Sequence, residues 1–273
     1  MSNPLKQYFR RPALHFTLPS KGKFYPEGAL EMPETGELPV YPMTAIDEIT
    51  SKTPDALFNG SATVDIIKSC VPAIKDPWTI PSIDLDAILI VIRSATHGSN
   101  FDIESTCIEC NETSTYIIDL MNILMAIQTN GFFEDLDLGE LKIQFKPLSY
   151  RQINAGNLVQ FDMQREISSL ESIEDFTERS MKSGETMKKL TSLNIEFLAN
   201  SIKHIITPNE TVSENGFILE FLRNCDRNTH DLIREKIIKM REDSSAKPQK
   251  MKCVNCSHEY EQAVALNLSD FFA

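Results

Sequence analysis

The sequence lacks the common motifs of nucleotide-binding and hydrolytic enzymes. A P-loop, a dinucleotide-binding G-x-G-x-x-G, a zinc-protease H-E-x-x-H and a serine-hydrolase G-x-S-x-G are all absent. The five histidines are scattered along the chain. The paired acids at 84/86 and 135/137 have a spacing that by itself seldom marks acid–base machinery. We therefore predict no catalytic residues and no small-molecule substrate.

Long hydrophobic runs are also absent. The most apolar stretch, residues 83–92, contains two aspartates and is too short to cross a bilayer, so it predicts a buried helix. The opening residues, MSNPLKQYFRRPALHF, have no apolar core of the kind that a signal peptide needs. We therefore expect no membrane partner and a cytoplasmic location.

Positive charge is scarce. The chain has 27 Lys and Arg against 39 Asp and Glu, a formal net charge of −12 at pH 7. Binding to a phosphate backbone depends on Lys and Arg side chains that displace counterions. This charge argues against nucleic acid as the main partner.

Cysteines are few, but four of the six form two pairs of identical spacing, Cys107-Ile-Glu-Cys110 and Cys253-Val-Asn-Cys256. Each C-x-x-C can direct two thiolates at one metal, and two such pairs supply the four sulfurs of a structural zinc site. Both pairs are followed by a polar turn, a Tyr-containing strand pattern and an apolar segment. The sequence therefore predicts one zinc ribbon, split by a large insertion, with a zinc that is structural because four sulfurs leave no open position.

Other states of these cysteines stay open at this point. The alternatives are disulfides and unreactive thiols. A redox-active disulfide is disfavoured because neither pair begins a helix in a βαβ unit, as a redox motif would. His258 could replace one thiolate, and the spacing does not distinguish zinc from iron. The two remaining cysteines, Cys70 and Cys225, lie on apolar segments and are predicted core residues.

Proline is concentrated at the N-terminal end, where the first 45 residues hold seven of the 14. Proline removes backbone donors and interrupts helices, so only short strands are expected there, around residues 14–18 and 38–40. The interpretation is an extended arm that docks either on a partner or on this chain's own body. The candidate docking residues are Tyr8, Phe9, Phe16, Phe24 and Tyr25.

The remainder is mostly helical in pattern. A strand is expected over residues 140–146, and a helix capped by Ser149 after it. The polar, acidic residues 168–185 favour a loop, and residues 185–207 favour a helix. A last helix from residue 229 is charged on most faces, which is typical of a solvated helix.

These patterns predict an α+β fold in which helix dominates. The expected organisation is a proline-rich arm (1–45), a helical segment (46–106), a split zinc ribbon (107–130 with 251–273) and a mainly helical insertion (131–250).

Several strings in the first half of the chain resemble the T-even-type bacteriophage baseplate proteins, the family associated with the baseplate hub and its assembly. They are NPLKQYFRRP, KFYP, VYPMTAIDE, TPDALFNG and IKDPW, together with the C-x-x-C after SATHG, and they cover roughly residues 3–125. The resemblance implies a non-enzymatic component of a contractile phage tail baseplate. Its partners would be other baseplate hub or tail assembly proteins, met in the host cytoplasm during assembly. Whether such a protein stays in the virion or leaves after assembly is not readable from the resemblance.

A second function is consistent with the cysteine pairs alone. Many zinc ribbons bind nucleic acid, so the alternative is a transcription-associated phage regulator. The scarcity of Lys and Arg near either pair disfavours this alternative.

Overall fold

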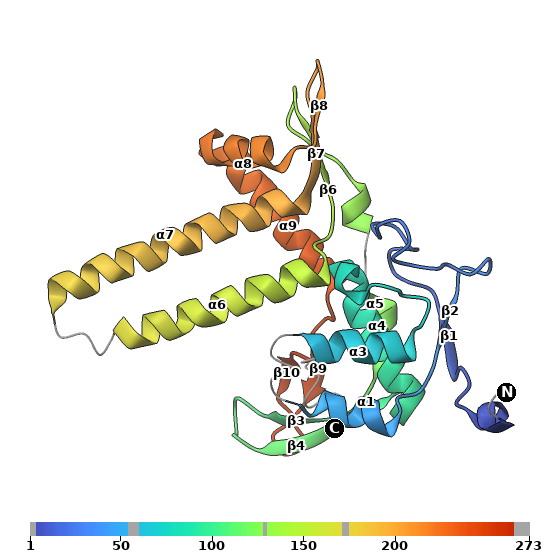
Figure 1. Ribbon diagram of the computed structural model, residues 1–273. Coiled ribbons are helices and arrows are strands. Elements are labelled where there is room, and N and C mark those ends of the chain that lie inside the picture. Colours follow the sequence, from blue (N-terminus) through green and yellow to red (C-terminus); the bar gives the residue numbers. More distant parts are fainter. Residues whose placement is uncertain (1–3, 54–59, 128–129, 171–174, 265–273) are drawn as a thin grey trace. The chain divides into compact units, whose positions relative to one another are not determined.

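The computed structural model describes residues 4–53, 60–127, 130–170 and 175–264. About 50% of the described residues are helical and 18% are in strands, which confirms an α+β class in which helix dominates. The chain divides into two compact units, one made of Met1–Gln128 with Asp243–Ala273 and the other of Thr129–Glu242 (Figure 1). The first unit is therefore built from both ends of the sequence.

The N-terminal part of the first unit forms short strands between prolines. It begins with the 3-10 helix η1 (Pro4–Tyr8), followed by β1 (Leu14–Phe16) and β2 (Leu38–Val40). The two strands pair antiparallel, with Leu14 opposite Val40. Leu18, Leu38 and Val40 are buried, so much of the predicted arm is part of this unit's own core.

Four helical elements follow in the part of the chain that the structure describes. They are α1 (Ala45–Ser51), α3 (Ser61–Cys70), the 3-10 turn η2 (Pro77–Thr79) and α4 (Ser82–His97). Thr44 and Asp47 cap α1 reciprocally, and Gly98 follows α4 with a φ of 87°, a conformation that glycine adopts at little cost. The isoleucines of α4 are buried, which confirms the predicted buried helix over residues 83–92.

Two groups of polar contacts, one at the buried Asp84 and one at the partly buried Arg10, attach the N-terminal residues to these helices. The Asp84 carboxylate accepts from the Ser20 backbone N–H at 2.8 Å, from the Ser20 hydroxyl and from the Tyr25 hydroxyl at 3.0 Å. The Arg10 guanidinium donates to the Ser69 carbonyl and hydroxyl, each at 2.7 Å, and lies 3.4 Å from the Asp47 carboxylate. These contacts satisfy polar groups that would otherwise be costly to bury.

Two β-hairpins complete the first unit. One joins β3 (Asn100–Thr106) to β4 (Thr113–Asp119) and leads into α5 (Leu120–Ala126). The other joins β9 (Gln249–Lys252) to β10 (Glu259–Gln262). Each hairpin turns at one of the two cysteine pairs.

The second unit carries a four-stranded antiparallel sheet in the order β5-β6-β7-β8. Its elements are η3 (Asn130–Phe133), β5 (Leu136–Asp137), β6 (Lys142–Phe145), α6 (Tyr150–Leu170), α7 (Phe176–Ser201), β7 (Ile202–Ile206), β8 (Thr211–Val212), α8 (Asn215–Asn224) and α9 (Arg227–Ser244), the last of which ends two residues inside the first unit. Helices α6 and α7 form a long hairpin (Figure 1), with an ion pair between Lys189 and Glu166. Ser149 and Gln152 bond each other's backbone N–H at the start of α6, which confirms the predicted cap.

Two expectations for this unit are wrong. The stretch expected as a loop is helical from Phe176 onward, because Asp175 caps the helix by accepting from the Glu178 N–H at 2.7 Å. Residues 171–174 of that stretch lie outside the described residues. The helix expected to reach residue 207 ends at Ser201, because the isoleucine-rich Ile202–Ile206 pairs with β6 as a strand. Helix α9 buries Ile233, Ile237 and Met240 along one face, while its charged side chains are exposed or partly exposed, as expected for a helix charged on most faces.

Candidate metal centre

The two C-x-x-C turns have the same backbone structure. In the first, the Cys107 N–H donates to the Glu112 carbonyl at 2.9 Å and the Asn111 N–H donates to the Cys107 carbonyl at 2.9 Å. In the second, the Cys253 N–H donates to the His258 carbonyl at 2.9 Å and the Ser257 N–H donates to the Cys253 carbonyl at 3.0 Å. The same two bonds recur at the same offsets from the first cysteine. Each turn therefore presents its two thiols in the same way.

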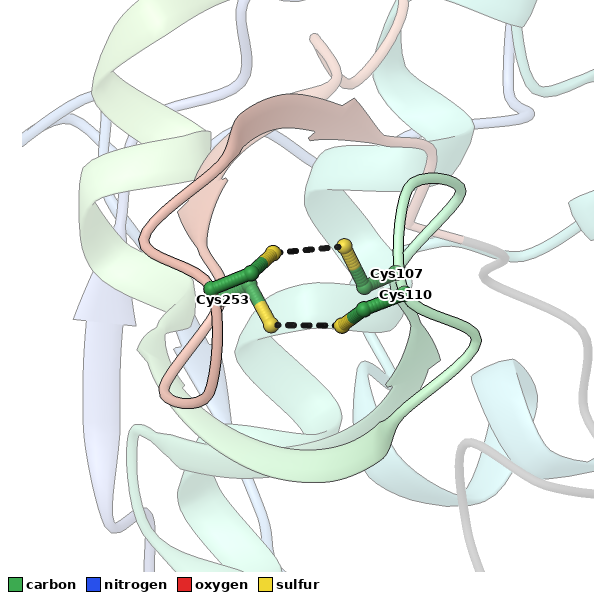
Figure 2. Close-up of side chains that lie close together, drawn as sticks. Cys107, Cys110 and Cys253 are labelled. Carbon is green, nitrogen blue, oxygen red and sulfur yellow. Dashed lines mark hydrogen bonds between the residues drawn. The ribbon is translucent and has the colours of Figure 1, made fainter.

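The four thiols meet in one cluster. The sulfur of Cys107 lies 3.6 Å from that of Cys256, and the sulfur of Cys110 lies 3.6 Å from that of Cys253. Figure 2 shows the two turns facing each other, with Cys107 and Cys110 on one side and Cys253 on the other. All four sulfurs lie within 4.8 Å of one another.

This geometry fits a tetrahedral metal ion. Zinc–sulfur bonds of about 2.3 Å in a tetrahedron place the sulfurs about 3.8 Å apart. The facing sulfurs at 3.6 Å are close to that separation, whereas a disulfide needs about 2.05 Å. All four cysteines are free thiols. The arrangement thus matches a four-sulfur metal site and not a pair of disulfides.

Histidine 258 does not take part in the cluster. Among the residues that the structure describes, the ligand atoms that gather here are the four cysteine sulfurs alone. The His258 ring stacks instead on Tyr260, with ring centroids 6.3 Å apart and planes 8° apart. The all-cysteine set predicted from the spacing is therefore the one that the fold assembles.

Backbone N–H donors lower the pKa of the clustered thiols, whereas burial and neighbouring thiols raise it. The pKa of Cys253 is lowered to about 7, chiefly because the Cys256 backbone N–H bonds its sulfur. A backbone bond from His258 lowers the pKa of Cys256, but burial and the neighbouring thiols raise it to about 12 overall. Thiolates held this close repel one another, and a bound cation would offset that repulsion.

The centre is partly enclosed and braced by contacts between the hairpins. Cys107 and Cys253 are buried, whereas Cys256 is exposed. The Ser105 hydroxyl donates to the Gln262 side-chain oxygen at 2.8 Å, and the Tyr116 hydroxyl donates to the Lys252 carbonyl at 3.2 Å. The tyrosine-containing strand pattern was visible in the sequence, but its cross-hairpin bond was not.

The predicted docking residues of the arm separate into two groups. Tyr8 and Phe9 are 77% and 56% exposed, so both are available to a partner. Phe16 is buried in the core of this chain, and Tyr25 bonds Asp84. Phe24, partly buried, sits at a φ of 72° in the turn between them. A role in partner binding remains a prediction, and it now concerns the exposed pair.

Comparison with known protein families places the chain in a phage family. A family model described as T4 bacteriophage base plate protein matches residues 14–273 of the chain. No curated protein and no solved structure matches. Among the described residues, no helix has both the length and the apolar character that crossing a bilayer requires.

Proposed function

Because this chain belongs to the T4 bacteriophage base plate protein family, we propose that it serves as a hub or hub-assembly protein of a contractile phage tail baseplate. Family membership supports a structural role in the baseplate and contact with other phage structural proteins. A role at the hub is more specific than the baseplate role that family membership supports. Its basis is the resemblance carried by strings such as NPLKQYFRRP and VYPMTAIDE.

The observation that carries the mechanism is the four-thiol cluster. We assign it one zinc ion, held by Cys107, Cys110, Cys253 and Cys256. Four sulfurs complete a tetrahedron, so the ion has no open position for substrate or water and its contribution is structural. It ties together two hairpins whose cysteines, Cys110 and Cys253, are 143 positions apart in the sequence. The protein would thus act by presenting a stable surface, without turnover.

The two hairpins support a split zinc ribbon. Its halves are residues 107–130 and 251–273, around a helical insertion over residues 131–250. Each half contains a C-x-x-C turn and the second strand of a hairpin, β4 or β10. The partner strands begin before these bounds, since β3 is Asn100–Thr106 and β9 is Gln249–Lys252. Residues 128–129 and 265–273 of the ribbon lie outside the described residues. The arm (1–45) and the helical segment (46–106) complete the proposed organisation.

The zinc assignment is tested by metal analysis of the chain purified without chelator. We expect about one zinc per chain. A strong chelator should remove the zinc and lower the melting temperature. Iron in place of zinc would change the identity of the metal, but the four-cysteine site would stand. Four thiols that react freely in the native protein, with no bound metal, would refute the site itself.

The assembly role is tested in phage-infected cells. The protein would act in the host cytoplasm on other hub or tail assembly proteins, so deletion of its gene should leave normal heads and absent or incomplete tails by electron microscopy. Probing purified virions for this chain then separates a resident baseplate component from one that leaves after assembly. Normal tails would refute the role. Tight, salt-sensitive DNA binding by the purified chain would instead favour the regulator alternative.

A further inference from the structure

The first unit carries two exposed surfaces of opposite charge. Residues 1–26 contain five Lys or Arg and no Asp or Glu, although the whole chain has a net charge of −12. Residues 100–119, which form the β3–β4 hairpin, contain five Asp or Glu and no Lys or Arg. Charge of each sign is thus concentrated in a separate segment.

Residues 4–11, at the start of this basic region, also expose large apolar side chains. Leu5, Tyr8 and Phe9 are 60%, 77% and 56% exposed, and η1 (Pro4–Tyr8) contains no buried residue. Lys6 and Arg11 are exposed beside them. The bonds of Arg10 to Ser69 attach the end of this segment to the body. We call residues 4–11 the basic segment.

The acidic hairpin has a matching outer face. Strand register places Ile117 opposite Asp102 and Thr115 opposite Glu104, and all four side chains are exposed. Ile117 is 70% exposed, and at the turn Ile108 is 75% exposed next to Glu109. We call this surface the acidic face. An exposed isoleucine flanked by carboxylates complements an aromatic residue flanked by Lys and Arg.

We propose that the basic segment of one copy of this chain docks on the acidic face of a second copy, so that the protein self-associates. The partner of the N-terminal residues is thus a second copy of the chain. This proposal rests on the proposed function in one respect, that the N-terminal residues form a contact surface. Leu5, Tyr8 and Phe9 would cover Ile117 and Ile108, while Lys6 and Arg11 would meet Asp102 and Glu104. A reciprocal pair of such contacts closes a dimer, and a single one per chain continues into a larger assembly.

A second copy is favoured because the chain itself supplies both halves of the contact. Elsewhere its acidic surface repels a like copy, so association depends on this pairing of opposite charges. The contact should weaken as ionic strength rises from about 0.01 M to about 0.15 M, since the Debye length falls from about 30 Å to about 8 Å.

Charge reversal on the full-length, metal-loaded chain provides the decisive test. Variant D carries Lys6→Glu with Arg11→Glu, and variant A carries Asp102→Lys with Glu104→Lys. By sedimentation velocity, the native chain should self-associate at low salt, while D and A should each be monomeric because like charges then face each other. Mixed together, D and A should associate, since in the mixture opposite charges meet at both contacts.

Apolar truncation tests the other half of the contact. Tyr8→Ser with Phe9→Ser should weaken self-association about tenfold or more. Met181→Ser is the matched control, because Met181 is an exposed apolar side chain of the second unit and its loss should change nothing. Melting temperature and metal content of every variant, measured alongside, exclude misfolding as the cause of a lost contact.

Several outcomes would overturn the inference. A native chain that stays monomeric at low salt and high concentration would do so, as would D and A that remain monomeric when mixed. If the native chain is monomeric but Tyr8→Ser with Phe9→Ser abolishes tail assembly, the basic segment binds another baseplate protein and the proposed function stands. If self-association behaves as described but tails form normally without the gene, the proposed function fails and the self-contact stands.

Discussion

Asn111 and Ser257 occupy equivalent positions in the two cysteine turns. Each directly follows the second cysteine of its pair, and each has a positive φ, of 56° and 61°. Each also donates its backbone N–H to the carbonyl of the first cysteine of its own turn. Two segments far apart in the sequence thus repeat one left-handed turn, which directs their thiols at a common point.

The left-handed conformation predicts an asymmetric response to glycine. Ser257→Gly should stabilise the metal-loaded protein by up to about 1 kcal/mol, because a side chain disfavours this conformation and glycine does not. Asn111→Gly should gain less, since asparagine adopts positive φ more readily than serine. Thermal denaturation of the two variants checks this order. A lower melting temperature for Ser257→Gly would mean that the serine side chain stabilises the turn by more than the left-handed conformation costs.

Loss of one thiol should release both ends of the first unit. Cys253→Ser is expected to lose the bound metal and to destabilise this unit by up to about 5 kcal/mol, the chain-entropy value for a link that closes a loop longer than about 100 residues. Cys225→Ser is the control, because Cys225 belongs to the second unit and is not one of the four clustered cysteines. Metal content and denaturant unfolding measure both effects. Equal melting of Cys253→Ser and native protein would show that the cluster does not hold the unit together.

The buried carboxyl of Asp84 predicts a pH dependence of stability. Burial raises its pKa from 3.8 to about 6, although the bonds from Ser20 and Tyr25 lower it in part. The folded state therefore binds the proton more tightly than the unfolded state, so this group stabilises the fold most below pH 4. That contribution is lost as the pH rises through about 6, and it amounts to about 3 kcal/mol at most.

The measurement is the melting temperature against pH for native protein and for Asp84→Asn. The amide keeps an acceptor for the Ser20 N–H but does not titrate, so the difference between the two curves should change between pH 4 and 6 and be flat above pH 7. Parallel curves across this window would show that Asp84 does not titrate there.

Two glycines should respond to alanine in opposite directions. A methyl group built at Gly184, inside α7, meets nothing within 4 Å, so Gly184→Ala should stabilise the helix by about 0.5–1 kcal/mol. At Gly22 the φ is 76° and the methyl would lie 2.6 Å from the Met32 Cε atom, so Gly22→Ala should destabilise. Thermal unfolding of both variants provides the comparison. A destabilising Gly184→Ala would point to a contact of that helix with another molecule.

Arg10 is expected to matter more for folding than its neighbour. Arg10→Ala removes the donors to the Ser69 carbonyl and hydroxyl and leaves the Asp47 carboxylate, 10% exposed, without its ion pair. We expect a loss of about 1–3 kcal/mol. Arg11→Ala, at an exposed position, should cost much less when measured at a dilution where the chain is monomeric. Similar losses for both variants would mean that the Arg10 contacts do not anchor the N-terminal residues.

The sequence alone identified the four cysteines of the candidate metal site and the family that the chain resembles. The matched spacing of Cys107–Cys110 and Cys253–Cys256 is a local property, because a C-x-x-C turn places its two thiols together whatever surrounds it. The buried helix over residues 83–92 and the cap at Ser149 were predictable for the same reason, since neighbours in sequence set them. The baseplate strings likewise needed no structure.

Only the tertiary structure decided what these pieces contact. Phe16 and Tyr8 are both aromatic residues between prolines, yet one is buried and the other exposed, and no local pattern distinguishes them. Ile202–Ile206 continues a helical pattern but pairs with β6, because burial of isoleucines in a sheet outweighs their helix propensity. The same holds for the cysteine cluster. Each turn is specified locally, but the 3.6 Å approach of Cys110 to Cys253 depends on both ends of the chain folding into one unit.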